Sequence, residues 1–339
     1  MKNLVFGLSC PEIILISDLS DIIDWLKHSA VILILFFLVL SGCRHEEEKV
    51  FMFSYFLGNG ETGLHLAYSE DGLTWEPLNE GNPVIAPTAG KDRLMRDPCI
   101  IIGGDGRFHM VWTTGWNDRY IGYANSEDLL NWSEQITIPV MMHEPEARNS
   151  WAPEVYYDKQ NDEYIIHWAT TIPGRHSAIE TSEREDHYNH RMYYTTTSDF
   201  ENFSDTRMFF NPDFSVIDCN ILEMDGKFYM FLKNENPVPP EKNIRLTVSD
   251  NAAGPYPLDV SQPITGDYWA EGPSALKVGD SVYVYFDKYI EGRYGAVRSK
   301  DMENWDDVSV MVSFPQGTRH GTAFTVNRSV LENLKREFE

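Results

Sequence analysis

The feature that most constrains the fold of this chain is a pattern that occurs five times. Each copy is an alternating strand-like segment, followed by a Ser or Thr and an Asp, and then by an aromatic residue a few positions on. The copies are LHLAYSEDGLTW (64–75), IGYANSEDLLNW (121–132), MYYTTTSDFENF (192–203), IRLTVSDNAAGPY (244–256) and GAVRSKDMENW (295–305). Internal repeats of this length are typical of propellers and other repeat architectures.

The segments between the copies also resemble one another, because each enters an apolar strand from a polar residue and, in most of them, turns into a second strand. They are RDPCIIIGGDGRFHMVW (96–112), APEVYYDKQNDEYIIHW (152–168), IDCNILEMDGKFYMFL (217–232), EGPSALKVGDSVYVYF (271–286) and RHGTAFTV (319–326). The last has no second strand after it, whereas FMFSYFL (51–57) and GLHLAYS (63–69) supply spare strands at the other end. The pattern predicts an all-β, five-bladed β-propeller of four-stranded blades, its ring closed by the N- and C-terminal strands.

A targeting segment precedes the repeats. The run AVILILFFLVL (30–40) is too short to span a bilayer comfortably, and it leads into LSGC (40–43). This resembles a bacterial lipoprotein signal, in which Cys43 becomes the lipidated first residue; an uncleaved anchor is the alternative. We therefore expect a signal in 1–42, a tether in 43–50, one propeller in 51–339, and an exported protein attached to a bacterial membrane only through its lipid.

The charge and the cysteines exclude other classes of protein. The chain has 28 Lys plus Arg against 52 Asp plus Glu, a net charge of −24, which disfavours binding to nucleic acid. Cys99 and Cys219 are the only cysteines in the predicted propeller. A single pair does not form a disulfide framework, so we expect buried free thiols. The sequence does not predict an oligomeric state.

Residues that begin the first strand of each blade converge on one end of the propeller channel. In this chain they are Asp97, Glu154, Asp218, Glu271 and His320. Four carboxylates and a histidine at one place repel one another and shift their pKa values, which is typical of a working site. Paired carboxylates of this kind suit glycoside hydrolysis, in which one donates a proton and another activates water or attacks the sugar.

The tryptophans fall into two groups. Trp75, Trp132 and Trp305 recur in register with the repeat, so we interpret them as packing between blades. A second group lies outside that register and beside the channel, where sugar rings stack on aromatic faces: Trp116, Trp151 and Trp269. Arg96, next to Asp97, would hold that carboxylate ionised or contact a sugar hydroxyl.

The ordered set RDP (96–98), WAPE (151–154), IDCN (217–220), EGPSA (271–275) and RHGTAF (319–324) resembles glycoside hydrolase family 43. The family consists of five-bladed propeller enzymes that act on arabinan, xylan and related side chains. By this resemblance Asp97 is the general base, Asp218 tunes and orients the acid, and Glu271 is the general acid. One departure is Cys219, which stands where the family commonly has proline.

The resemblance also implies the supporting residues. His320 resembles a channel histidine that often lies near a calcium or sodium ion, so a structural Ca²⁺ is expected, with no cofactor required for the chemistry. Glu154 would support the site and would contact the substrate, together with Arg96, Arg319 and the second group of tryptophans. The segment 173–191 is interpreted as a surface insertion, and its histidines as part of a solvated loop rather than a metal site.

The expected reaction is a single displacement with inversion, most favourably of α-L-arabinofuranosides and otherwise of β-xylosides. It requires roughly 6.5–9.5 Å between the carboxyl groups, against about 5–5.5 Å for retention. The sequence leaves two alternatives open: a fructan-hydrolysing propeller, which also uses an RDP motif, and a glycan-binding lipoprotein of the same fold without turnover.

Overall fold

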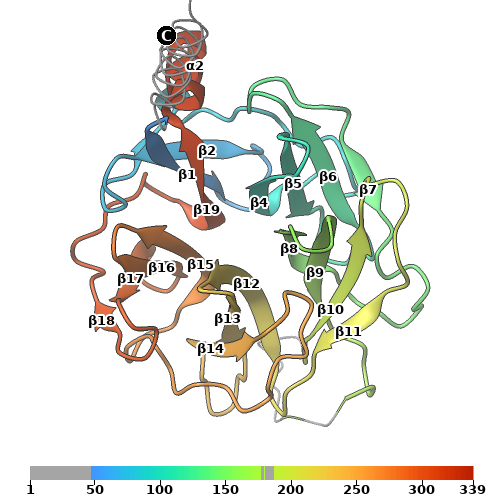
Figure 1. Ribbon diagram of the computed structural model, residues 1–339. Coiled ribbons are helices and arrows are strands. Elements are labelled where there is room, and N and C mark those ends of the chain that lie inside the picture. Colours follow the sequence, from blue (N-terminus) through green and yellow to red (C-terminus); the bar gives the residue numbers. More distant parts are fainter. Residues whose placement is uncertain (1–46, 177–178, 180–186, 339) are drawn as a thin grey trace, which may run out of the picture. The chain divides into compact units, whose positions relative to one another are not determined.

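The computed structural model describes residues 47–176, 179 and 187–338, and the described chain forms five sheets arranged in a ring (Figure 1). The predicted five-bladed β-propeller is confirmed. The predicted signal and Cys43 lie outside the described residues, as does much of the insertion at 173–191. Among the described residues, no helix is both long enough and apolar enough to cross a bilayer.

Each blade extends outward from its innermost strand. Blade 1 is β19 (Arg319–Asn327), β1 (Lys49–Phe56), β2 (His65–Ser69) and β3 (Glu76–Pro77). Blade 2 is β4 (Arg96–Ile102), β5 (Phe108–Thr113), β6 (Ile121–Ser126) and β7 (Ile136–Ile138). Blade 3 is β8 (Trp151–Asp158), β9 (Glu163–Thr170), β10 (Arg191–Thr197) and β11 (Arg207–Phe210). Blade 4 is β12 (Val216–Met224), β13 (Lys227–Asn234) and β14 (Asn243–Ser249), and blade 5 is β15 (Glu271–Val278), β16 (Ser281–Lys288), β17 (Arg293–Ser299) and β18 (Asp306–Asp307).

The ring closes as predicted, because β19 pairs antiparallel with β1, from Lys49 opposite Asn327 to Phe56 opposite Arg319. β1 begins at Lys49, so the last two residues of the predicted tether already belong to the propeller. The innermost strands contact one another all the way round, in the order β19, β4, β8, β12, β15 and back to β19. Ring closure therefore pairs the two terminal strands with each other, so neither β1 nor β19 is left with a long unpaired edge.

Blade 4 departs from the prediction of four strands, since its sheet has only three. The segment that follows β14 carries prolines at 255, 257 and 263, which have no N–H to donate to a ladder. It lies beside β14 through separate backbone bonds instead: Ser261 N donates to Leu246 O and Ile264 N to Ile244 O, each at 2.9 Å. The fourth strand is thus replaced by an irregular edge.

The repeated Asp and aromatic residues form one turn that recurs from blade to blade. In blade 2 Asp128 Oδ1 accepts hydrogen bonds from the N–H groups of Leu130 at 2.9 Å and Asn131 at 2.7 Å. An aspartate that satisfies two backbone donors in this way fixes the turn. The aromatics pack as expected, with Trp75 only 3% exposed and Trp132 and Trp305 against the buried clusters.

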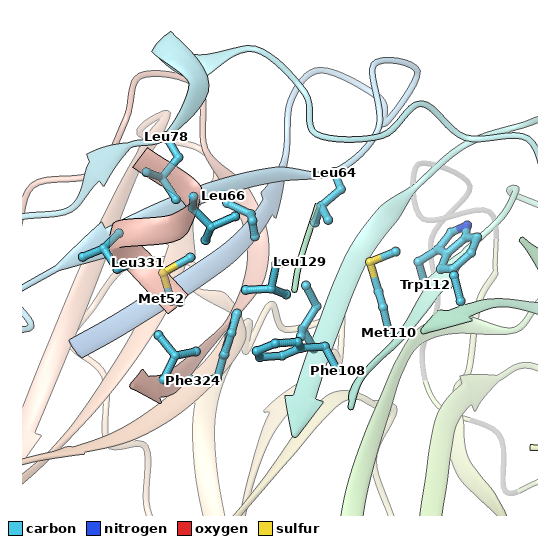
Figure 2. Close-up of a cluster of buried hydrophobic side chains, with 14 of the residues drawn as sticks. Met52, Leu64, Leu66, Leu78, Phe108, Met110, Trp112, Leu129, Phe324 and Leu331 are labelled. Carbon is cyan, nitrogen blue, oxygen red and sulfur yellow. The ribbon is translucent and has the colours of Figure 1, made fainter. Parts of the chain in front are cut away.

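The core consists of separate apolar clusters, as expected when each sheet packs on its neighbours. Figure 2 shows the cluster between blades 1 and 2, where Met52 of β1 faces Phe108 and Met110 of β5 across Leu129. The helix α2 (Arg328–Phe338) adds the buried side chains of Leu331 and Leu334 to this cluster. This C-terminal helix was not predicted from the sequence.

Candidate active site

A β-bulge at the start of every innermost strand builds the site. In each pairing the register shifts so that two residues of the inner strand are left unpaired. These pairs are Asp97–Pro98, Ala152–Pro153, Asp218–Cys219, Gly272–Pro273 and His320–Gly321. A bulge bends the strand and re-aims a side chain, so the same irregularity on five strands directs five positions to one place.

The first residue of the bulge adopts a left-handed backbone in four of the five blades. The φ angles are 51° at Asp97, 45° at Ala152, 56° at Asp218 and 61° at Gly272. Aspartate and glycine tolerate this region better than most residues, and such strain concentrates at functional sites. At Gly272 a Cβ would lie 2.4 Å from the His320 ring, so glycine is also required for space.

Three of the predicted site residues occupy this first bulge position and meet one another. His320 Nδ1 lies 3.4 Å from Asp97 Oδ1 and 3.9 Å from Asp218 Oδ1. Thr113 Oγ1 donates to Asp97 Oδ2 at 2.9 Å, and Gly272 N donates to Asp218 Oδ2 at 3.0 Å. Each aspartate is therefore held by a neighbouring strand as well as by its own.

The five charged residues do not occupy equivalent positions in their strands. Glu271 precedes its bulge, in the position that Arg96 and Arg319 hold in other blades, and Glu154 follows its bulge, in the position of Asn220. Glu154 consequently lies deeper, is 5% exposed, and accepts a hydrogen bond from Asn220 Nδ2 at 2.8 Å. It supports the inner strands and does not line the cavity.

A cavity of about 240 Å³ at this end of the channel is lined by all the predicted site residues except Glu154 and Trp269. Trp116 is 42% exposed, and the Arg96 guanidinium lies 4.4 Å from its ring centroid. Trp151 meets Trp116 edge to face at 5.4 Å. Trp269 does not line the cavity but contacts Tyr289, which does, with ring centroids 5.9 Å apart.

Sequence reasoning missed several residues of the cavity wall, of which Lys233 and Glu235 matter most. They stand in the segment FLKNEN (231–236), Lys233 near the end of β13 and Glu235 directly after it. The available signal was a charge directly against an apolar run, the same signal that singles out Asp97. The repeated pattern predicts site residues only where the first strand of each blade begins, whereas Lys233 and Glu235 lie where a second strand ends.

The electrostatics distinguish the carboxylates. Burial raises the pKa of Asp97, but the hydrogen bond and charge of His320, together with Arg96 and Thr113, outweigh it and leave that pKa at about 2. Burial lowers the pKa of His320, yet the charges of Asp218, Asp97 and Glu154 raise it to about 9. At neutral pH the pair is therefore an aspartate and an imidazolium.

Asp218 is shifted the other way. Burial and the charges of Glu271 and Asp97 raise its pKa to about 6, although His320 and Lys233 oppose this. Burial likewise raises the pKa of Glu154 to about 8. Carboxyl groups with opposite shifts in one cavity can divide acid and base roles between them.

Glu271 is held by two cations. Its Oε2 accepts from Lys233 Nζ at 3.0 Å and its Oε1 lies 3.2 Å from Arg319 Nη2. Burial raises the pKa of Glu271, but these cations outweigh it and hold the pKa below its ordinary value. The two cations contact the carboxylate directly and stabilise its ionised form, so burial does not keep the pKa of Glu271 high.

The donor set does not fit a metal held by side chains. Within the described part of the chain, no three His, Cys, Asp or Glu side chains are placed to hold a metal ion together. His320, the expected ligand, instead turns its Nδ1 toward Asp97 and Asp218 and supplies a positive charge between them. No step of the chemistry below passes through a metal.

The fold and the site together define a class: five-bladed propellers with aspartates, a glutamate and a histidine at the channel mouth. The match in sequence agrees, since residues 46–332 match the family-43-related family described as "Probable glycosyl hydrolase domain". The chain belongs to that family of glycoside hydrolases.

Individual relatives are more distant. The chain is 26% identical over 202 residues to an alpha-L-arabinofuranosidase of Bifidobacterium longum subsp. longum, a match that covers 52% of this chain and 18% of that protein. The structure is similar to a Bacteroides ovatus protein described as Xyloglucan PUL GH43B, with a TM-score of 0.51 and 20% identity over 69% of this chain and 43% of that one. A thermostable family-43 glycoside hydrolase gives a TM-score of 0.51 and 15% identity, covering 67% and 78% of the two chains. These structures show the fold alone.

Proposed function

We propose that this protein hydrolyses O-glycosidic bonds in the side chains of plant-type polysaccharides or oligosaccharides, α-L-arabinofuranosides first and β-xylosides second. The observation that carries the proposal is the meeting of Asp97, His320 and Asp218 beside Glu271 in one cavity. The family supports the reaction class, and the arabinofuranosidase relative supports the sugar.

The proposed mechanism is a single displacement with inversion. Asp97, with a pKa of about 2, is ionised at neutral pH and takes a proton from a water molecule. The water oxygen attacks the anomeric carbon as the glycosidic bond breaks. Glu271 gives its proton to the departing oxygen on the opposite face, and Asp218, bonded to the N–H of Gly272, orients the strand that carries Glu271.

Glu271 must gain a proton before it acts, because Lys233 and Arg319 hold its pKa below the ordinary value. A sugar that fills the cavity removes water from the carboxylate and raises its pKa, since desolvation disfavours the charged form. Proton uptake would then accompany substrate binding. The aromatic wall of Trp116 and Trp151 offers faces on which the sugar can stack.

The two alternatives have less support. A binding protein without turnover would not need the three carboxylates of the family, yet all three line the cavity. A fructan-hydrolysing propeller finds no support in the matched family.

Attachment to a membrane through Cys43 remains part of the proposal. It is supported by the apolar run and LSGC at 30–43. Cell fractionation of the full chain and of Cys43→Ala tests it. Release of the variant from the membrane fraction supports a lipid anchor, and an unchanged distribution contradicts it.

The reaction is tested with a panel of 4-nitrophenyl and alkyl glycosides, with binding measured in parallel. We expect hydrolysis of the α-L-arabinofuranoside or the β-xyloside, and ¹H NMR of the first product should show the inverted anomer. Glu271→Gln should retain activity on the activated nitrophenyl glycoside better than on the alkyl glycoside, which depends on the acid. Binding without hydrolysis would contradict the proposal that the protein is an enzyme. A product with retained anomeric configuration would contradict the inverting mechanism.

A further inference from the structure

Lys233 lies between two carboxylates of the cavity. It is the penultimate residue of β13, and its side chain is 3% exposed. Its Nζ donates to Glu271 Oε2 at 3.0 Å and lies 2.6 Å from Glu235 Oε2. A single positive charge is therefore shared between Glu271 and a carboxylate that has no part in the reaction described above.

This lysine belongs to a row of alternating charges. Glu235 Oε1 accepts from Lys242 Nζ at 2.7 Å, so Glu235 has a cation on each side. At the other end Arg319 lies between Glu271 and Asp287, with its Nε 2.6 Å from Asp287 Oδ2. The row is Lys242, Glu235, Lys233, Glu271, Arg319 and Asp287.

The position of the row suggests more than a stabilising contact. A buried ion pair is weak support for stability, because removing both charges from water costs about as much as their attraction returns. Lys233, Glu235 and Glu271 all line the cavity, where a bound sugar would replace the water around them. Any change that moves the Lys233 ammonium group closer to Glu235 weakens its interaction with Glu271.

We propose that Lys233 is a positioning residue for Glu271, and that the division of its charge between Glu271 and Glu235 sets whether Glu271 carries a proton when the glycoside binds. The inference rests on the proposed role of Glu271 as the general acid. Lys233 itself touches no reacting atom in this scheme.

Other charged or titratable groups also face Glu271 or share its cavity. They are Arg319 and His320 of β19, Asp218 of β12, Asp287 of β16 and Tyr289 after it. Arg319 is shared in a similar way with Asp287, but it occupies the predicted substrate-binding position beside His320. Lys233 can be varied without removing a predicted substrate contact.

The structure permits a test with two variants of opposite effect. Lys233→Met leaves Glu271 with Arg319 and Glu235 with Lys242, so neither carboxylate loses its last cation. Glu235→Gln removes the competitor and keeps an oxygen for Lys242, so the charge of Lys233 falls on Glu271 alone. The measurement is the pH dependence of kcat/KM on the alkyl glycoside that the wild type cleaves, whose alkaline limb reports the acid of the free enzyme.

We expect Lys233→Met to move the alkaline limb upward by about one to three pH units, the usual effect of one opposite charge at this distance. Glu235→Gln should move it downward, and Lys233→Arg should stay near the wild type. Lys227→Met is the matched control, because Lys227 begins the same strand and pairs with Asp250 outside the cavity. Its profile should not change.

Shifts in the same direction, or no shift in either variant, would overturn the role of Lys233 and leave Glu271 as the acid. If Lys233→Met fails to fold by near-UV circular dichroism, Glu235→Gln decides: a downward limb supports the inference and an unmoved limb overturns it. Failure of the proposed function is recognised separately, since Glu271→Gln would then cleave the alkyl glycoside at nearly the wild-type rate.

Discussion

His320 Nδ1 lies 3.4 Å from Asp97 Oδ1, although the two residues are far apart in the sequence. His320 comes from β19 and Asp97 from β4, and these strands are neighbours in the channel only because β19 pairs with β1 and completes blade 1. Ring closure thus supplies the cation that keeps the proposed base ionised.

The first prediction concerns the proposed base. Asp97→Asn keeps the shape and an oxygen for Thr113 but removes the charge that accepts a proton from water. We expect kcat/KM to fall by about 10²- to 10⁴-fold, the usual contribution of an acid or base. Asp250→Asn, on the surface, should leave it unchanged. Turnover near the wild-type rate in Asp97→Asn would show that another residue activates the water.

The second prediction concerns the pH dependence of stability. The pKa of His320 is raised from 6.5 to about 9 in the folded protein, so its contribution is complete below pH 6.5 and is lost as pH rises through 9. The loss is on the order of 3 kcal/mol, since one pKa unit corresponds to about 1.4 kcal/mol. Urea unfolding between pH 6 and 10 measures it.

His320→Gln should be less stable than the wild type at pH 6 and should lack that decline. The exposed His143 provides the control, because His143→Gln should follow the wild-type curve. If the stability of His320→Gln declines with pH in the same way as that of the wild type, another group causes the decline.

The third prediction concerns Glu154. Burial raises its pKa from 4.5 to about 8, so the folded protein holds a proton that the unfolded chain releases, and stability falls as pH rises from 4.5 to 8. Glu154→Gln keeps an acceptor for Asn220 and has no charge to bury. We expect it to match the wild type near pH 4.5 and to be more stable at pH 8, by thermal unfolding.

Glu154→Ala separates the charge from the hydrogen bond, because it leaves a void and an unpaired Asn220 amide. It should be less stable than the wild type at both pH values. If Glu154→Gln is instead less stable than the wild type at pH 8, Glu154 is ionised at that pH and its charge stabilises the folded protein.

The fourth prediction concerns Cys219, which occupies the second position of its bulge, where three other blades have Pro98, Pro153 and Pro273. Because that position tolerates residues without an N–H, Cys219→Pro should change the free energy of unfolding by less than about 1 kcal/mol. Cys99→Pro, at a residue paired with Val111 in the ladder, should be much more destabilising. If urea unfolding shows that both variants lose the same free energy of unfolding, the bulge positions are not equivalent.

Both thiols are free and buried, as expected from the sequence. Burial is the first cause that raises the pKa of Cys99 and of Cys219 well above the ordinary thiol value. Neither has a part in the proposed chemistry.

The sequence by itself determined the number of blades, the closure of the ring and the end of the channel at which the charges gather. Those follow from local patterns, since alternation marks a strand and the repeated Asp and aromatic residues mark a turn. The register of Trp75, Trp132 and Trp305 was enough to assign them to packing. The prolines that prevent a fourth strand in blade 4 were visible in the sequence, but the separate backbone bonds that Ser261 and Ile264 make to β14 were not.

Only the tertiary structure decided which charges touch. A bulge changes by one residue which side chain points into the channel, so Glu154 and Glu271 could not be placed relative to Asp97 by counting along the strands. Lys233 reaches Glu271 from another blade, and no local pattern records a contact between blades. The pKa of Glu271 follows from that contact, because charge interactions depend on distance and burial and not on separation in sequence.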